Sequence, residues 1–200
     1  EERVIQGEEI IEILVLPGSR NDEVKRLLPI YMKSIKNLKQ KFTTLKVSVV
    51  KSSSVSQDYF SLYDDLFDYI YRDTEIITAM KSATVCLATS GTVTLSTALF
   101  GIPTVVCYKT SLFNEFIFSS IVNYKNYFSL PNLILGKEIF PELIQNSLSN
   151  YSIEKNLERW ITSKEERTHT SDMLMNLRKK LSFNEVDVGE YIGTNMLREI

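Results

Sequence analysis

The sequence is poor in the residues that form most metal sites and many hydrolytic sites. Its 200 residues include two cysteines and one histidine. The histidine, His169, lies in a polar stretch, so no His/Cys cluster has the spacing of metal ligands, and we expect no metal ion. Cys86 and Cys107 lie in apolar runs, where a free thiol behaves as a small hydrophobic side chain. We therefore predict reduced, buried cysteines, as in a cytoplasmic protein, and disfavour zinc enzymes and cysteine hydrolases.

The sequence also lacks an excess of positive charge and long apolar runs. Its 23 Lys and Arg residues against 25 Asp and Glu residues give a net charge of −2. Nucleic-acid binding that is independent of sequence depends on a basic excess, so we expect no nucleic-acid partner. No run approaches the roughly 20 apolar residues that cross a bilayer. We expect a soluble cytoplasmic protein, attached at most peripherally to a membrane surface.

The length of the sequence and its first residues indicate how many domains to expect. A chain of this length with 44% hydrophobic residues can bury the core of one globular domain. It begins at Glu1, in a charged stretch without the apolar core of a secretory signal. We therefore expect a piece of a longer protein.

Short β-type runs alternate with helical patterns through more than half of the sequence. This alternation predicts βαβ units, that is, a parallel sheet covered by helices. After the first strand, apolar residues recur every three or four positions from Val24 to Phe42, which predicts an amphipathic helix with a solvated lysine face. Pro29 within it predicts a kink, or a short helix followed by a restart. The expected strands are residues 10–16, 45–50, 68–71, 84–88 and 104–108.

Beyond Thr110 the pattern is mainly helical. Residues 113–124 (FNEFIFSSIVNY) are rich in aromatics and are interpreted as a core or interdomain helix, the alternative being a surface for acyl chains or a membrane interface. Ser163 and Glu166 form a capping box ahead of a helix. Its shared apolar face consists of Met173, Leu174, Leu177 and Leu181.

Two loops that follow buried strands are suited to an anion, because ligands of open parallel sheets bind outside the carboxyl ends of strands. In LPGSR, residues 16–20, the Ser19 hydroxyl and backbone N–H groups can approach a phosphate while Arg20 offers a fork of donors. The alternative is a plain turn with Arg20 on the surface. The second loop, at the start of a helix, consists of Ser90, Gly91 and Thr92 and resembles a diphosphate-binding site. Such residues are also ordinary helix caps.

A third candidate site lies further along the sequence. Asn132, next to Pro131, could present its amide to a ring edge, and Glu142 and Gln145 near a helix start could hold hydroxyl groups. The alternatives are a turn-forming Asn132 and a Glu142 that serves as a helix N-terminal acid.

Three motifs together carry a family resemblance. They are LPGSR followed by Glu23 and LLP, then TSGTVTLSTALFGIPTVVCYK, then SLPNLILGKEIFPELIQ. In this order and with these gaps, they resemble the C-terminal half of bacterial lipid-A-disaccharide synthase over residues 10–150. The resemblance implies an inverting glycosyltransferase without metal or cofactor. It would transfer 2,3-diacylglucosamine from UDP-2,3-diacylglucosamine to lipid X, which is 2,3-diacylglucosamine 1-phosphate, giving lipid A disaccharide 1-phosphate and UDP.

The resemblance also implies a fold and a site. The fold would be α/β, with a Rossmann-like parallel sheet, helices on both faces and a C-terminal helical tail. Residues 1–150 would bind the UDP donor and residues 151–200 would form the helical extension. Arg20 would contact the UDP diphosphate beside Ser19, and the diphosphate-binding site would be lined by Ser90, Gly91 and Thr92. The donor site would be bordered by Asn132, Glu142 and Gln145.

The sequence departs from the family pattern in two ways. The family usually has a glutamate for the ribose hydroxyls where this chain has Ser96. The catalytic residues are expected in an N-terminal half that this chain lacks, so we expect the 200-residue piece alone to be inactive. The alternatives are another UDP-sugar glycosyltransferase or epimerase of this fold, or a non-catalytic interaction module. The sequence leaves open a homodimer and a peripheral position on the inner face of the inner membrane.

Overall fold

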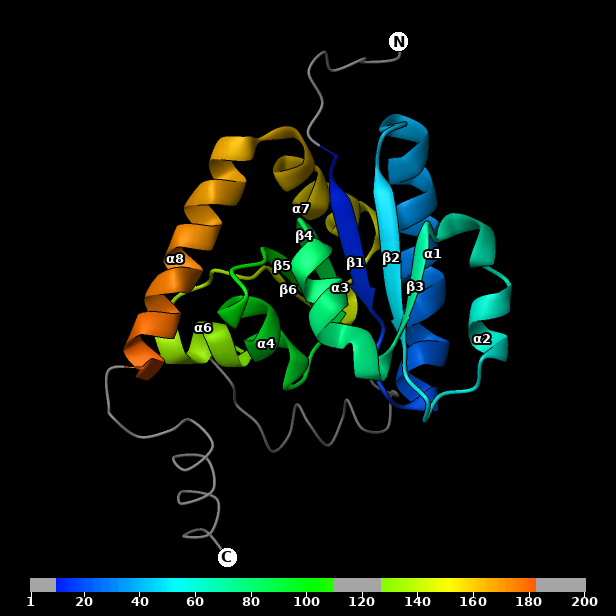
Figure 1. Ribbon diagram of the computed structural model, residues 1–200, viewed down its shortest axis with the longest axis horizontal. Coiled ribbons are helices and arrows are strands. Elements are labelled where there is room, and N and C mark those ends of the chain that lie inside the picture. The colour runs from blue at the N-terminus through cyan, green and yellow to red at the C-terminus, as the bar shows by residue number, and fades with distance from the viewer. Residues whose placement is uncertain (1–9, 110–126, 183–200) are drawn as a thin grey trace, which may run out of the picture.

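A computed structural model describes residues 10–109 and 127–182, which build one sheet of six parallel strands with helices on both faces (Figure 1). The sheet order is β3-β2-β1-β4-β5-β6. The predicted α/β fold is confirmed, and the five expected strands are all present, with ends within two residues of expectation. The strands are β1 (Glu12–Leu16), β2 (Lys46–Lys51), β3 (Tyr69–Arg72), β4 (Val85–Thr89), β5 (Thr104–Tyr108) and β6 (Glu142–Ile144).

Seven α-helices lie within the described residues. They are α1 (Asn21–Lys41), α2 (Asp58–Ser61), α3 (Ile76–Ser82), α4 (Val93–Leu99), α6 (Leu130–Leu135), α7 (Asn150–Thr162) and α8 (Lys164–Ser182). Short 3-10 helices are η1 (Asp64–Leu66), η2 (Asp73–Glu75) and η3 (Gln145–Ser147). The aromatic segment 113–124, interpreted above as a core or interdomain helix, lies outside the described residues.

Alternating residues of the buried strands divide the core into two sides. Ile13 and Val15 of β1 join the cluster that contains α1 and α7, including the fully buried Trp160. Leu14 and Leu16 point to the opposite face and pack with α3. Because side chains alternate across a strand, a parallel strand with helices on both faces is apolar at nearly every position. This explains why the first strand could be identified from its continuous apolar run.

Helix α1 is a single helix from Asn21 to Lys41 with Pro29 inside it. The expected restart after Pro29 is therefore wrong. A proline removes the bond to the carbonyl four residues earlier, which here belongs to Lys25. Both Pro29 and Lys25 are exposed, so water can solvate that carbonyl, while Leu27, Leu28 and Tyr31 keep the inner face of the helix buried.

The helix predicted to follow Ser163 is present as α8. The Ser163 hydroxyl accepts a hydrogen bond from the Glu166 N–H at 3.2 Å, where α8 begins. Leu174 and Leu177 of α8 are fully buried against Ala98 of α4. The predicted apolar face of this helix therefore packs on the side of the sheet where α4 lies.

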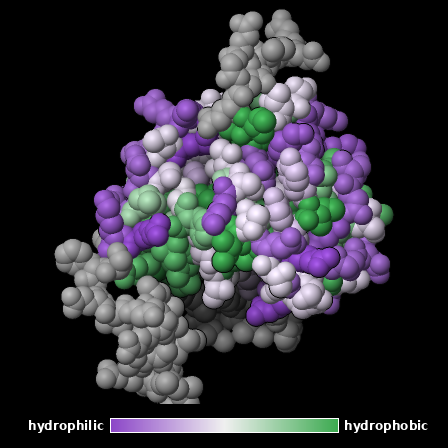
Figure 2. Space-filling model, in the orientation of Figure 1, coloured by the Kyte–Doolittle hydropathy of each residue, from purple (hydrophilic) through white to green (hydrophobic). Residues whose placement is uncertain are grey.

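The surface is mixed. Figure 2 shows hydrophobic side chains gathered where α4 and α6 lie in Figure 1. The exposed apolar residues of these helices and their ends include Phe100, Leu130, Leu133 and Ile134. Among the described helices, none has the length and apolar character needed to cross a membrane.

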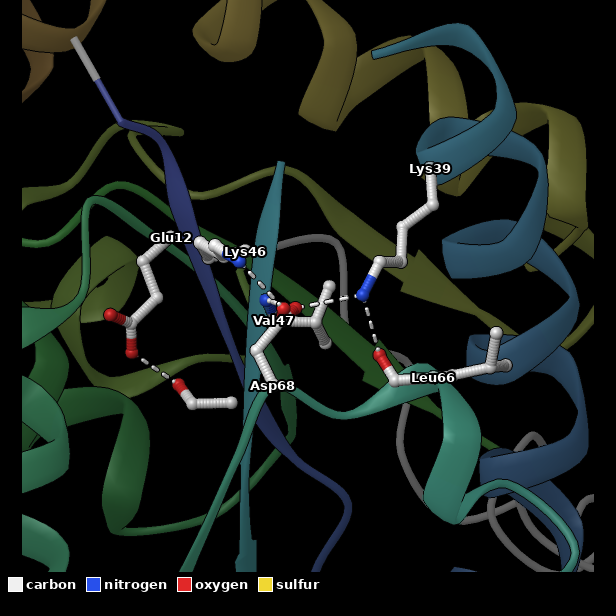
Figure 3. Close-up of polar contacts among 7 residues, drawn as sticks. Glu12, Lys39, Lys46, Val47, Leu66 and Asp68 are labelled. Atoms are coloured by element: carbon white, nitrogen blue, oxygen red, sulfur yellow. Dashed lines mark hydrogen bonds and ion pairs between the residues drawn. The ribbon is translucent and has the colours of Figure 1, made fainter. Parts of the chain in front are cut away.

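A polar cluster holds the edge strand β3 at the amino end of the sheet (Figure 3). Asp68 accepts hydrogen bonds from Lys39 at 2.7 Å, Lys46 at 3.0 Å and the Val47 N–H at 2.9 Å. Partial burial alone would raise the pKa of Asp68, but these hydrogen bonds lower it below its usual value. Asp68 thus fastens the start of β3 to both β2 and α1, at the end of the sheet remote from the loops considered next.

Candidate functional site

The strand order reverses between β1 and β4, and a cleft of about 420 Å³ opens at the carboxyl ends of the strands there. Such a reversal is where open α/β sheets bind ligands, and the volume lies within the range of small-molecule sites. Five residues predicted from the sequence line this one cleft: Ser19, Arg20, Ser90, Gly91 and Thr92. The fold therefore brings the two predicted anion loops together.

The first loop turns sharply between β1 and α1. Gly18 has a φ of +108°, which side chains other than glycine rarely adopt. A Cβ atom there would lie 2.9 Å from the Glu23 Oε2 atom. Arg20 is the N-cap of α1, and the first helical bond runs from the Val24 N–H to the Arg20 carbonyl. The N–H groups before Val24, at the start of a 21-residue helix, therefore have no partner within the helix, and such a helix start favours an anion.

A serine-rich loop braces the first loop from the side of β2. The Ser54 hydroxyl donates to the Ser19 carbonyl at 2.9 Å, and the Ser56 N–H donates to the Asn21 side-chain oxygen at the same distance. The sequence predicted a polar loop and a short helix in residues 51–63, and both are present. Its role as a brace depends on tertiary contacts that no local pattern reveals.

The second loop, Ser90 to Thr92, follows β4. The Ser90 N–H continues the sheet by bonding to the Cys107 carbonyl at 2.8 Å, while Gly91 and Thr92 are exposed to the cleft. Helix α4 begins at Val93 and has seven residues. Two hydroxyl groups and an open backbone are therefore presented beside Arg20.

A buried hydrogen bond lies beneath the cleft. The Tyr31 hydroxyl of α1 and the Thr89 hydroxyl of β4 are 3.2 Å apart, and both side chains are buried. Burial holds the pKa of Tyr31 well above its usual value. Cys86 and Cys107 are free and buried as predicted, and burial raises the pKa of Cys107 to about 12. Neither thiol is therefore a nucleophile at neutral pH.

Two acidic residues of the cleft were missed by the sequence reasoning. Glu23 forms an ion pair with Arg20, at 2.9 Å between Oε1 and Nη1. Asp73 lines the far side of the cleft and accepts hydrogen bonds from the Ser53 N–H and hydroxyl, which lower its pKa. Glu23 stood within a recognised motif, but its contact depends on the turn at Gly18. Asp73 follows β3 and had no local signal.

Asn132 and Glu142 do not line the cleft. Asn132 is fully buried: its oxygen accepts from the Ile139 and Phe140 N–H groups, and its amide donates to the Phe140 carbonyl and the Glu142 carboxylate. The expectation that this amide faces a ligand ring is wrong, because backbone groups of the turn after α6 use it. Pro131 lies in the first turn of α6.

Glu142 lies in strand β6, so the expected helix start is wrong. Its carboxylate accepts from the Phe128 N–H, the Ser129 N–H and hydroxyl, and the Asn132 amide, each at 2.7 Å. Ser129 is the N-cap of α6, so the carboxylate sits at the start of a different helix. Together these contacts clamp α6 to β6.

Gln145 does not share a helical face with Glu142 either. It begins the 3-10 helix η3 after β6 and has a φ of +50°, the one positive value found at a described residue other than glycine. Ser96 lies on α4, partly buried, and is not among the residues of the cleft. No group of three or more His, Cys, Asp or Glu side chains within residues 10–109 and 127–182 is placed to hold a metal ion.

Comparison with known proteins gives consistent matches to one family. The model of the lipid-A-disaccharide synthetase family matches residues 2–195. The lipid-A-disaccharide synthase of Hydrogenovibrio crunogenus is 30% identical over 157 residues, covering 76% of this chain and 42% of that protein. The Rickettsia felis enzyme of the same name is 29% identical over 189 residues, covering 94% and 48%. The chain thus spans about half the length of the curated relatives it matches.

Solved structures agree on the fold. A GtfA/B complex matches with a TM-score of 0.58 and 7% identity, over 97% of this chain and 37% of that one. A glycotransferase of kitacinnamycin matches with a TM-score of 0.53 and 12% identity, over 90% and 41%. The likeness at these identities concerns the arrangement of strands and helices. Since the family model spans nearly the whole sequence, this chain belongs to the lipid-A-disaccharide synthetase family.

Proposed function

We propose that this chain is the donor-binding half of a lipid-A-disaccharide synthase, and that its cleft holds the diphosphate of a UDP-activated sugar. The observation that carries the proposal is the meeting of two anion-ready loops at one cleft, where the strand order reverses. Family membership supplies the substrate class, because the relatives named above are lipid-A-disaccharide synthases.

The chemistry of the cleft suits a diphosphate. Arg20 has five N–H donors, of which the bond to Glu23 uses one, so the guanidinium can still engage phosphate oxygens. Hydroxyl groups of Ser19, Ser90 and Thr92 and the N–H groups at the start of α1 add neutral donors. In glycosyl transfer the diphosphate leaves with extra negative charge, and fixed donors aimed at that charge stabilise the transition state.

The sugar donor, the acceptor and the position at a membrane are proposed for the whole protein, of which this chain is one part. The donor would be UDP-2,3-diacylglucosamine and the acceptor lipid X, with residues 1–150 as the nucleotide-binding domain and residues 151–200 as its helical extension. No metal or cofactor is required by this proposal. Diacylated substrates reside in a membrane, so the whole enzyme would work peripherally at the inner face of the inner membrane.

Calorimetric titration of the 200-residue chain tests the nucleotide part. UDP should bind, uridine should bind more weakly, and Arg20→Ala should weaken UDP about tenfold or more, because a charge-assisted bond to phosphate is lost. Arg26→Ala is the matched control, since Arg26 lies in the helix that Arg20 caps but outside the cleft lining. A folded chain that gives no heat with UDP would contradict the proposal.

Assays of the full-length parent test the substrate. The diacylated UDP-glucosamine donor should give transfer to lipid X, and the non-acylated donor should give none. Equal turnover of the non-acylated donor would instead favour another UDP-sugar glycosyltransferase of this fold.

A further inference from the structure

We propose that Glu23 is a positioning residue that fixes the Arg20 guanidinium for the incoming diphosphate. This inference rests on the proposed function and concerns the same cleft. A carboxylate that lines an anion site is unexpected, because its charge repels the ligand. The charged side chains in the cleft lining are Arg20, Glu23 and Asp73, so acids already outnumber bases there.

The Glu23 carboxylate is held between two parts of the first loop. Its Oε1 atom lies 2.9 Å from the Arg20 Nη1 atom, and its Oε2 atom lies 2.9 Å from where a Cβ of Gly18 would be. The absence of a side chain at Gly18 therefore leaves the room in which this carboxylate lies. The side chain of Glu23 is 20% exposed, whereas that of Arg20 is 80% exposed. The ion pair thus ties a largely exposed guanidinium to a largely covered carboxylate.

Three ordinary explanations for an acid at this position do not account for the contact. A glutamate at the third position of a helix usually reaches back to the backbone N–H of the N-cap. Here the carboxylate accepts from the side chain of the N-cap residue, Arg20. An ion pair with one partner this exposed also contributes little to stability. Favourable interaction with the helix dipole does not distinguish Glu23 from Asp22, which lies in the same first turn.

Orientation of the Arg20 side chain before the ligand binds explains the Glu23–Arg20 contact. Arginine loses much rotamer freedom when it binds a phosphate, and a side chain already held in place loses less on binding. The single Nη1–Oε1 bond leaves the other guanidinium donors for the ligand. We infer that orientation of Arg20 outweighs the repulsion between Glu23 and the diphosphate.

The sign of one substitution tests this inference. Glu23→Ala removes a negative charge from the cleft, so repulsion alone predicts tighter UDP binding, whereas loss of positioning predicts a Kd raised about tenfold. Calorimetry should show the weaker binding with UDP and an unchanged Kd for uridine, which has no phosphate. Glu23→Gln should restore most of the affinity, because its amide oxygen can still accept from Arg20.

Asp22→Ala is the matched control. Asp22 pairs with Arg26 at 3.5 Å, so this variant removes the same charge from the same helical turn without touching Arg20. Its Kd for UDP should stay at the wild-type value. In an Arg20→Ala background, Glu23→Ala should cause no further loss, since no guanidinium remains to be positioned.

The outcomes separate this inference from the proposed function. Absence of UDP binding by the folded wild-type chain contradicts the proposed function. Wild-type binding together with an equal or tighter Kd for Glu23→Ala, or an equal loss of UDP and uridine affinity, overturns the positioning role alone. Thermal unfolding of each variant identifies a misfolded one. If Glu23→Ala misfolds, Glu23→Asp decides, because it keeps the negative charge but its shorter side chain no longer reaches the Arg20 guanidinium. Glu23→Asp should raise the Kd for UDP and leave that for uridine unchanged, and an unchanged Kd for UDP overturns the inference.

Discussion

At the scale of single residues, the cleft depends on a backbone conformation that only glycine adopts easily. Gly18 lets the chain turn from β1 into α1 and leaves the space in which the Glu23 carboxylate lies. Gly91 in the second loop has no atom within 4 Å of an added Cβ. The two glycines of the cleft therefore serve different purposes.

This difference predicts that the same substitution, glycine to alanine, costs stability at Gly18 and has almost no effect at Gly91. Gly18→Ala should lower the free energy of unfolding by about 2 kcal/mol, because alanine is strained at this positive φ and its Cβ would press on Glu23. Gly91→Ala should change it by less than about 0.5 kcal/mol. Urea denaturation measures both. Equal stability of Gly18→Ala and the wild type would contradict the assigned strain.

Elements outside the cleft are held by buried polar contacts of residues that the sequence offered both as candidate ligand contacts and as structural residues. Asn132 and Glu142 join α6 to β6 and the turn between them. Motif matching identified both residues as important, but it could not separate a contact to a ligand from one inside the protein. The distinction needs the distances, since an amide with every hydrogen-bonding position used has none left for a ring edge.

Removal of the Asn132 side chain tests this structural role. Asn132→Ala leaves two buried N–H groups and one buried carbonyl without their partner, so unfolding should become easier by about 3 kcal/mol. The folded variant should still bind UDP with the wild-type Kd. Asn146→Ala, at an exposed position nearby, should leave stability unchanged. A stable Asn132→Ala variant that has lost UDP affinity would restore the ligand role.

The edge strand gives a prediction with a defined pH dependence. The pKa of Asp68 is lowered in the folded protein, so its stabilising effect is complete well above the unfolded pKa of about 3.9 and is lost as the pH falls through the folded value. Asp68→Asn should therefore be destabilised by about 1 kcal/mol at pH 7, and this deficit should shrink steadily as the pH falls below about 4. Asp65→Asn, at an exposed site, is the control. Denaturation at pH 7 and at a series of pH values below 4 measures the deficit, and a deficit that stays constant over this series would rule out the charged carboxylate as its cause.

At the scale of the whole molecule, the sequence predicted the strands whose apolar runs are continuous and failed where tertiary contacts decide. β6 was missed because it has three residues, of which only Leu143 is buried. Pro29 was expected to kink α1 or to divide it into a short helix and a restart, but α1 runs unbroken through it, because the buried face of α1 outweighs one lost hydrogen bond. Helix α7, at the start of the predicted helical extension, shares the main core with the sheet through Leu157 and Trp160, and no local pattern indicates these contacts.

The sequence likewise predicted the part of the site that follows directly from the strands and missed the part that depends on tertiary contacts. Arg20 and the Ser90–Thr92 loop follow strands, so the rule for parallel sheets places them at one edge. Glu23 and Asp73 needed the turn at Gly18 and the end of β3 to bring them into the cleft. Local chemistry thus indicated an anion site, and the fold identified the acids that accompany it.

The most direct test of the central claim is an NMR titration of the ¹⁵N-labelled chain with UDP. We predict saturable shifts of the backbone signals of Ser19, Arg20, Ser90, Gly91 and Thr92, with little change at Asn132 and Glu142. Uridine should leave the signals of the two anion loops nearly unmoved. Saturation with UDP that shifts residues elsewhere and leaves both loops unchanged would contradict the assignment of this cleft as the diphosphate site.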